Sequence, residues 1–216
     1  GPGFTNVADT VDRGLPAVMV SNRIESTPLG SAEWIKFLAP FYGAESLANE
    51  RFAEMEAAYE ETAQTVRDAL DDDFRAGYFC MDPNRGCEFM AGHGPRSLNG
   101  HILDTLGVTN VFADGNDAPN GMGFDYESSL GRASDADFFV IYDRLSIIED
   151  LLASDGRFGE FAALAEGRYI GFIDSEYPRC RFTSTVQVDL LIRDYAIGMV
   201  PDLFADEEPT CFGPPG

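Results

Sequence analysis

The sequence predicts an α/β protein: a parallel sheet with helices on both faces, preceded by a long connecting helix. Over 74–205, short runs of strand-forming residues alternate with helical patterns, which is the order that builds a parallel sheet. Over 44–73, apolar residues recur at three- and four-residue steps between polar ones, and this spacing predicts one amphipathic helix of about 25 residues. The composition, 44% hydrophobic and 24% charged, fits an ordered globular chain.

The first part of the chain predicts a short strand and a helix. The apolar run over 17–21 is rich in strand-forming residues. Thr27 followed by Pro28 is typical of a helix start, because it offers an N-cap and then a proline in the first turn. The sequence over 29–42 is apolar nearly all round, so we expect this helix to be buried on most sides and to end at Gly43.

The α/β lobe and its tail follow the long helix, which ends at an acidic run over 71–73. We expect strands at 75–80, 108–113, 138–142 and 169–173, and helices at 98–106, 126–133, 147–153, 158–165 and 185–199. The acidic and proline-rich residues 206–216 predict a flexible tail. Parallel sheets covered by helices bind ligands beyond the carboxyl ends of their strands, so a site is expected in the loops that follow the strands.

The charge of the chain excludes two classes of partner. It carries 37 acidic side chains against 15 basic ones, a formal net charge of -22. Such a surface repels nucleic acid phosphates and anionic lipid head groups, so neither nucleic acid nor a membrane surface is expected as a partner. The apolar runs are far shorter than the roughly 20 residues of a membrane span, so the chain is not expected to be membrane-spanning.

The cysteines favour an oxidising compartment. There are four, an even number, and none is in a CxxC pair. Cys80 and Cys87 are close enough in sequence to bridge across a loop, and Cys180 is expected to approach the same rim. Unpaired core cysteines are the alternative interpretation.

The loop over 80–97 is long, polar and glycine-rich, and it follows the first strand of the lobe. Asp82, Glu88 and His93 offer a set of candidate metal ligands, and Arg85 and Arg96 offer an anion-binding set. The alternative is a loop whose polar residues satisfy its own backbone. The sequence has no HExxH motif and no CxxC pair, which excludes the common zinc motifs.

Arginine and aromatic side chains follow two later strands. After the strand at 138–142 comes Arg144, and after the strand at 169–173 comes the segment DSEYPRCRF. Guanidinium groups fit carboxylate or phosphate groups, and rings fit flat ligands, although pairing with surface carboxylates is the alternative for the arginines. The candidates at this edge are Tyr142, Arg144, Tyr177, Arg179, Arg181 and Phe182. No GxSxG, P-loop or GxGxxG motif is present, so the chain is not expected to be an enzyme.

The segment ESTPLGSAEWIKFLAPFYGAESLANERF, over 25–52, resembles the helical-backbone class of periplasmic substrate-binding proteins, which serve ABC importers of ferric siderophores, haem and cobalamin. The segments VFADGND, SDADFFVIYD and RFGEFAALAEGRYIGF are also similar to this family. The resemblance implies two α/β lobes joined by one long helix, with the ligand between them. Residues 1–43 would then be the last strand and helix of the N-terminal lobe, 44–73 the backbone helix and 74–205 the C-terminal lobe.

The resemblance also implies a function. We expect non-enzymatic capture of a metal chelate, an iron or cobalt complex, with no intrinsic cofactor and with the permease of an ABC importer as the partner. The location would be periplasmic, or extracellular and lipid-anchored at the cell surface. The expected ligand-binding residues are Arg85, Arg96, Tyr142, Arg144, Tyr177, Arg179, Arg181 and Phe182.

Two other functions fit the same sequence. One is direct binding of a bare metal ion by Asp82, Glu88, His93 and Tyr177. The other is a binding-protein fold reused as an interaction or structural subunit.

Overall fold

Three parallel strands form the middle of the sheet: β1 (Arg75–Cys80), β5 (Phe138–Arg144) and β6 (Tyr169–Phe172). The computed structural model describes residues 7–14, 17–18, 20, 25–183 and 185–216. Within these residues the sheet has seven strands in the order β4-β2-β1-β5-β6-β7, and the two-residue β3 (Thr109–Asn110) pairs in parallel with β1. The predicted α/β fold class is confirmed.

The two edges of the sheet are antiparallel, whereas the sequence predicted a parallel sheet throughout. On one edge β2 (Met90–Gly92) pairs with β1, and β4 (Met122–Phe124) pairs with β2. On the other edge β7 (Phe212–Gly213) pairs with β6. The cause at the β2 edge is the short β1–β2 connection, because a parallel neighbour needs a crossover of a dozen or more residues.

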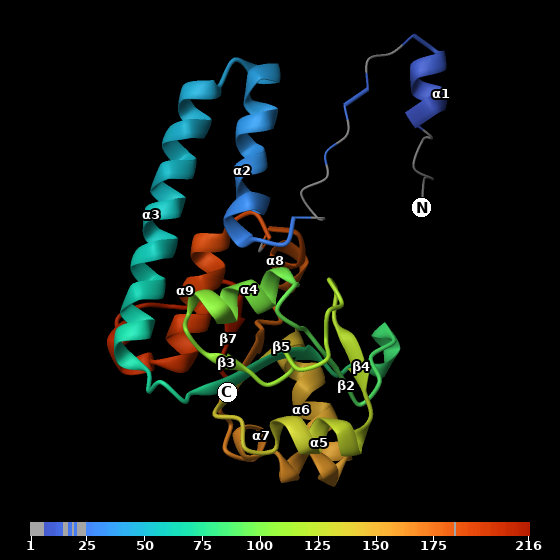
Figure 1. The fold of residues 1–216 in the computed structure, drawn as a ribbon, viewed down its shortest axis with the longest axis vertical. Coiled ribbons are helices and arrows are strands. Elements are labelled where there is room, and N and C mark those ends of the chain that lie inside the picture. The colour runs from blue at the N-terminus through green and yellow to red at the C-terminus, as the bar shows by residue number, and fades with distance from the viewer. Residues whose placement is uncertain (1–6, 15–16, 19, 21–24, 184) are drawn as a thin grey trace.

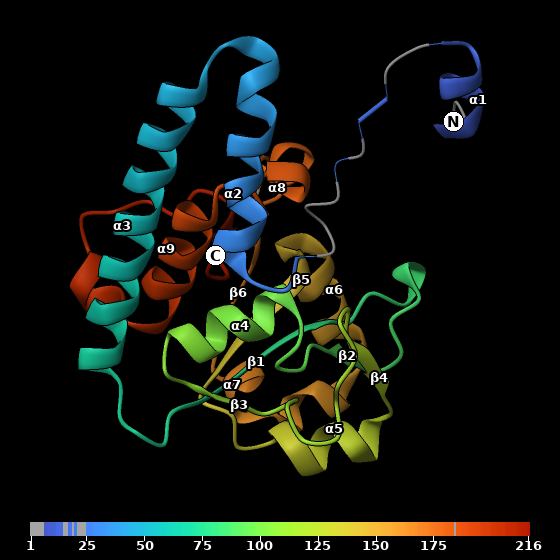
Figure 2. The same cartoon turned by 45° about the horizontal axis from the view of Figure 1, so that its top comes forward.

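Alternate side chains of the strands point to opposite faces and build two cores. In β5, Phe138 and Val140 belong to one core, and Phe139 and Ile141 belong to the other. Helices α3, α4 and α9 cover the first face, and α5, α6 and α7 cover the second (Figure 1, Figure 2). The helices are α1 (Val7–Asp12), α2 (Pro28–Leu38), η2 (Ala39–Tyr42), α3 (Glu45–Ala69), η3 (Pro83–Arg85), α4 (Leu98–Thr105), α5 (Tyr126–Ala133), α6 (Leu145–Ser154), η4 (Gly156–Glu160), α7 (Ala162–Ala165), α8 (Tyr177–Thr183), α9 (Val188–Met199) and η5 (Pro201–Phe204).

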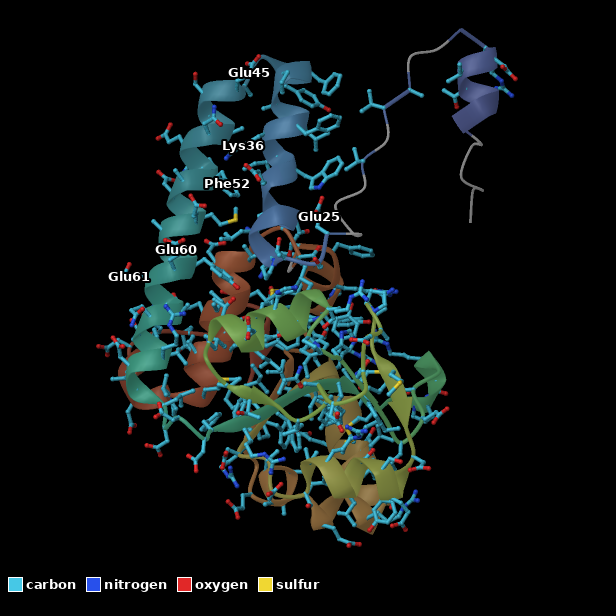
Figure 3. The ribbon with its side chains drawn as sticks, in the orientation of Figure 1. Glu25, Lys36, Glu45, Phe52, Glu60 and Glu61 are labelled. Atoms are coloured by element: carbon cyan, nitrogen blue, oxygen red, sulfur yellow. A yellow bond between two sulfur atoms is a disulfide. The ribbon has the colours of Figure 1, made fainter. Side chains whose placement is uncertain are left out.

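The long helix predicted over 44–73 is α3, which has 25 residues. With α2 it forms an antiparallel hairpin whose tip extends away from the sheet (Figure 1). Lys36 and Phe52 face each other across this hairpin (Figure 3), and Lys36 Nζ lies 3.7 Å from the centre of the Phe52 ring. No helix in the described part of the chain is both long enough and apolar enough to cross a bilayer.

The helix at 28–38 begins as predicted but is less buried than predicted. Thr27 is its N-cap, and its side chain accepts a hydrogen bond from Gly30 N at 3.3 Å. Phe37 and Phe41 are nevertheless 46% and 60% exposed, so the prediction of burial on most sides is wrong for the structure. One side of α2 packs against α3 and α4, and its aromatic side faces away from them.

Four predicted elements differ from those in the structure: three are in the α/β lobe, and one is in the first segment of the chain. The strand predicted at 108–113 is cut to Thr109–Asn110, because the Asn110 side chain accepts from Phe112 N and turns the chain. The helix predicted at 158–165 is divided at Phe161, whose backbone is extended. The helix predicted at 185–199 begins at Val188. Residues 17, 18 and 20 are not in a strand, and the rest of 17–21 lies outside the described residues.

The end of the chain differs from the predicted flexible tail. Phe212 belongs to β7, which pairs with β6. Cys211 forms a disulfide with Cys180. The buried carboxylate of Asp194 accepts hydrogen bonds from the backbone N–H groups of Thr210, Cys211 and Phe212 at 2.7–2.9 Å. These contacts hold residues 210–213 against the sheet.

Candidate ligand-binding site

The loop that follows β1 is built as a closed turn. The Asp82 side chain caps the single-turn helix η3 by accepting from Asn84 N at 2.9 Å, and Gly86 ends it in the left-handed conformation with φ 78°. A disulfide joins Cys80, the last residue of β1, to Cys87. This turn carries Arg85 at the carboxyl edge of the sheet.

Asp143 holds this turn from the neighbouring strand. Its side chain, 1% exposed, accepts from Met81 N at 2.7 Å and from Asp82 N at 3.2 Å. Burial raises the pKa of Asp143, and the two backbone donors and the Arg85 charge act in the opposite direction. The carboxylate therefore ties the start of the β1–β2 loop to β5.

Arg85 is held against the same strand. Its Nη1 donates to the Tyr142 carbonyl at 2.5 Å and lies 3.2 Å from Asp143 Oδ1. The guanidinium carbon lies 4.4 Å from the centre of the Tyr142 ring. The side chain of Arg85 is 29% exposed, so part of this five-donor group still faces solvent.

Arg144 and Tyr177 complete a hollow beside Arg85. Arg144 lies 5.7 Å from the centre of the Tyr177 ring, and its Nη1 lies 3.9 Å from Asp174 Oδ1. The hollow has a volume of about 200 Å³, and we call it the arginine hollow; its lining is Asp82, Arg85, Asp143, Arg144, Ile147 and Tyr177. Two guanidinium groups and a phenol ring at one sheet edge can bind a carboxylate and pack on a flat ligand.

A second hollow of about 200 Å³ adjoins the first across the Arg85–Tyr142 pair. We call it the histidine hollow. Most of its lining comes from the α/β lobe: Tyr78, His93, Ser97, Leu98, Asn99, Pro119, Asn120 and Tyr142. The rest comes from the segments around α2 and α9: Glu25, Ser31 and Thr185. Glu25 lies at the base of α2, where the hairpin meets the lobe (Figure 3). The hollow therefore lies between the first segment of the chain and the α/β lobe.

His93 is the only imidazole among the residues that line the histidine hollow. Its ring contacts Tyr78 edge-on, with centroids 4.7 Å apart, and within the described part of the chain its buried Nδ1 has no hydrogen-bond partner. Burial lowers the pKa of His93 to about 4. The imidazole is therefore neutral at pH 7, the form that binds metal.

The other predicted ligand-binding residues lie apart from these hollows. Arg179 is paired with Glu176 at 2.9 Å and reaches the Thr210 carbonyl at 3.4 Å, beside the end of the chain. Arg181 lies over the ring of Phe182, which is 69% exposed. Arg96 is exposed next to the start of α4, and among the described residues neither hollow is lined by it. The structure thus brings together Arg85, Tyr142, Arg144 and Tyr177.

The three predicted metal ligands do not meet. Asp82 lines the arginine hollow and His93 lines the histidine hollow. Glu88 lines a third hollow, of about 570 Å³, together with Phe89 and Tyr126. Among the residues that the structure describes, no three His, Cys, Asp or Glu side chains are placed to hold one ion. The cause is that β2, Met90–Gly92, lies between Glu88 and His93 and so separates them along its length.

The disulfides match the predicted cysteines in part. Cys80 pairs with Cys87, as the sequence suggested. Cys180 does not approach that rim, because it is in α8 and is bonded to Cys211.

Sequence reasoning missed Asp143 and Asn99. Side chains of a strand alternate between its two faces, so Asp143 lies on the same buried face as Phe139 and Ile141. A carboxylate at a position where the pattern predicts a buried side chain needs partners, and this feature of the sequence could have identified Asp143. Asn99 accepts from Tyr195 Oη at 3.0 Å and lines the histidine hollow. No pattern in the sequence singles out Asn99.

Solved structures of other proteins share this fold. No protein-family model matches the sequence, and no curated protein matches it. Among solved structures, a periplasmic haem-binding protein of Pseudomonas aeruginosa is similar with a TM-score of 0.69 and 12% identity, covering 97% of this chain and 72% of that one. The chain has the fold of the periplasmic substrate-binding proteins of ABC importers.

Two further solved structures are similar in fold to this chain. An ABC transporter substrate-binding protein of Listeria monocytogenes has a TM-score of 0.67 and 10% identity, covering 90% of this chain and 72% of that one. IsdE of S. aureus, solved in complex with haem, has a TM-score of 0.61 and 11% identity, covering 81% of this chain and 66% of that one. This chain spans 57–72% of the length of such structures. The resemblance stated from the sequence is confirmed for the fold.

Proposed function

We propose that the chain is one lobe of a substrate-binding protein that captures a metal chelate bearing carboxylate groups and delivers it to an ABC importer. The observation that supports this most is the convergence of Arg85, Arg144, Tyr142 and Tyr177 at the carboxyl edge of a sheet with this fold. Guanidinium groups would bind the carboxylates, and the rings would pack on the flat part of the chelate. The capture involves no covalent step, so the chain is not an enzyme.

Haem is the first candidate among the chelates, and ferric siderophores and cobalamin are the others. Haem is flat, carries two carboxylates and leaves axial positions on its iron. The neutral imidazole of His93, in the hollow next to the arginines, would suit such a position. A structure similar in fold is described as a haem-binding protein, which supports the same choice.

The proposed location is outside the cytoplasm, in a periplasm or at a cell surface. Its support is the pair of disulfides, since such bonds persist in oxidising compartments. The permease of the importer is the proposed protein partner. Closure of a second lobe on the ligand, about the long helix α3, is the proposed motion.

The test is an absorption titration of the chain, and of the whole gene product, with haem, ferric siderophores and cobalamin. We expect haem to shift its Soret band on binding and the Arg85→Ala/Arg144→Ala variant to bind more weakly. Arg179→Ala/Arg181→Ala is the matched control, since it also removes two positive charges, from residues that do not line the hollows. Absence of a shift with all three chelates for the whole gene product would contradict the proposal.

An interaction role is the second candidate function. The exposed aromatic side of the hairpin favours it. The Phe37 ring contacts Trp34, with centroids 5.2 Å apart, and Phe41, with centroids 6.0 Å apart. The neighbouring Tyr42 is 83% exposed. Light scattering of the wild type and of Phe41→Ser would test this role. It predicts an assembly that the substitution dissociates, whereas chelate binding would be unchanged.

A further inference from the structure

The Cys80–Cys87 disulfide closes the turn that carries Arg85. Cys80 is the last residue of β1, and Cys87 lies three residues before Met90, the first residue of β2. Asp143 ties the outgoing half of the turn through Met81 N and Asp82 N. The disulfide ties the returning half, directly after Gly86. The backbone of Arg85 therefore lies between the two hydrogen bonds to Asp143 on one side and the disulfide on the other.

The two disulfides differ in their access to solvent. Cys180 and Cys211 are 0% and 4% exposed, so both sulfur atoms are enclosed. Cys87 is 8% exposed, but Cys80 is only partly buried. A thiolate must reach a sulfur atom to open a disulfide, and exposed disulfides are the labile ones. The Cys80–Cys87 bond is thus the one that an external thiol reaches first.

We propose that the Cys80–Cys87 bond is a redox-sensitive tie that positions Arg85 for ligand binding, so that opening it releases captured ligand. This proposal rests on the proposed function of the arginine hollow. The reductant is a dithiol: its two sulfurs become a disulfide, and the two electrons and two protons they give up convert the Cys80–Cys87 bond into two thiols. The Cys180–Cys211 bond is untouched at that stage.

The consequence for the ligand follows from what remains of the turn. After reduction, Asp143 still holds Met81 and Asp82, and the Phe89 ring still stacks on Phe158 with centroids 4.6 Å apart. Residues 86–88 between these two fixed points are then free to move away from β1. Arg85 then exchanges between its place over Tyr142 and open conformations. Loss of one charge-assisted contact weakens binding by about tenfold or more, so we expect a rise in Kd of about that size.

The first experiment needs no ligand. The chain is treated with increasing dithiothreitol, alkylated, and then digested briefly with trypsin, which cleaves the Arg85–Gly86 bond when the turn is open. We expect alkylation at Cys80 and Cys87 first, together with faster cleavage at Arg85 and unchanged cleavage at Arg181. The proposal is overturned if Cys180 and Cys211 are alkylated first, or if Arg85 stays uncleaved after Cys80 and Cys87 are alkylated.

The second experiment measures haem binding to Cys80→Ser/Cys87→Ser, with Cys180→Ser/Cys211→Ser as the matched control. We expect about a tenfold rise in Kd for the first pair and none for the second. If the control fails to fold, stepwise reduction of the wild type replaces it. In an Arg85→Ala background the effect of opening the Cys80–Cys87 bond should vanish, which a general loss of stability would not produce. An unchanged Kd for Cys80→Ser/Cys87→Ser would contradict the redox tie. Absence of binding of haem, ferric siderophores and cobalamin alike by the wild-type whole gene product would instead contradict the proposed function.

Discussion

The guanidinium of Arg85 lies 4.4 Å from the centre of the Tyr142 ring and donates to the carbonyl of the same residue at 2.5 Å. Its Nη1 also lies 3.2 Å from the buried carboxylate of Asp143. Burial raises the pKa of Asp143, and Arg85 is the counter-charge that, together with the N–H groups of Met81 and Asp82, acts against that rise. One side chain thus serves both the stability of the rim and the proposed binding of ligand.

Removing Arg85 should destabilise the fold as well as weaken binding. Arg85→Ala leaves Asp143 buried without its counter-charge, and we expect a loss of about 1–3 kcal/mol in the free energy of unfolding. Urea denaturation of the single variants and of Arg85→Ala/Asp143→Asn measures the coupling. The double variant should lose less than the sum of the two single losses, because no unpaired charge remains. Simple additivity would show that the pair is not coupled.

The partly buried imidazole of His93 should make stability depend on pH. Burial lowers its pKa in the folded protein to about 4, against 6.5 for an ordinary histidine. Between those values the unfolded chain binds a proton that the folded chain does not, so stability falls as pH drops from about 6.5 to about 4. Relative to His93→Phe, which keeps a ring against Tyr78, the wild type should lose about 2–3 kcal/mol over that window.

The measurement is a series of urea melts of both proteins from pH 7 to pH 4. Burial raises the pKa of Asp143 and of Asp194, which gives a contribution of the opposite sign in both proteins. The difference between wild type and His93→Phe cancels these contributions. Parallel pH profiles would mean that His93 titrates normally in the folded chain.

Much of the fold could be predicted from the sequence, because it depends on periodicity. The strand at 75–80 and the helix at 126–133 have the predicted bounds, and the helix over 45–69 has the predicted length. The edge strands β2, β4 and β7 are two or three residues long, too short to show an alternation. Their position depends on loop closure and on the Cys180–Cys211 pairing, which sequence alone does not determine.

The candidate site could be predicted only in part. Placing Arg85, Tyr142, Arg144 and Tyr177 together required nothing more than the rule that parallel strands end at one edge of the sheet. The same rule cannot say which way a side chain of α8 points, and Arg181 turns away from the edge that Tyr177 faces. The choice depends on the helical rotation of α8, and DSEYPRCRF does not show where that helix begins.

The packing of residues 210–212 against the sheet should depend on Asp194. One carboxylate accepts three backbone N–H groups, and an amide at that position offers a single oxygen. We expect Asp194→Asn to lower the free energy of unfolding by about 1.5–3 kcal/mol. Hydrogen exchange at Thr210, Cys211 and Phe212 should accelerate. Asp206→Asn, an exposed carboxylate nearby, is the control and should change neither.

The arginines of the rim should not be equivalent in ligand binding. Arg144 lines the arginine hollow with Arg85, whereas Arg181 lies over the exposed ring of Phe182. The net charge of -22 repels any anionic ligand equally in both variants, since each loses one positive charge. A difference between Arg144→Ala and Arg181→Ala therefore reports contact rather than the overall field.

We expect Arg144→Ala to raise the Kd for haem by about tenfold and Arg181→Ala to change it less than twofold, that is by less than about 0.4 kcal/mol. Arg144→Lys should recover only part of the loss, because an ammonium group cannot make the paired contacts that a guanidinium makes with a carboxylate. Titrations at low and high salt separate the two causes, since a contact inside a hollow is screened less than a surface charge. Equal losses for Arg144→Ala and Arg181→Ala, both removed by salt, would mean that the arginines only moderate the acidic field and that the ligand binds elsewhere.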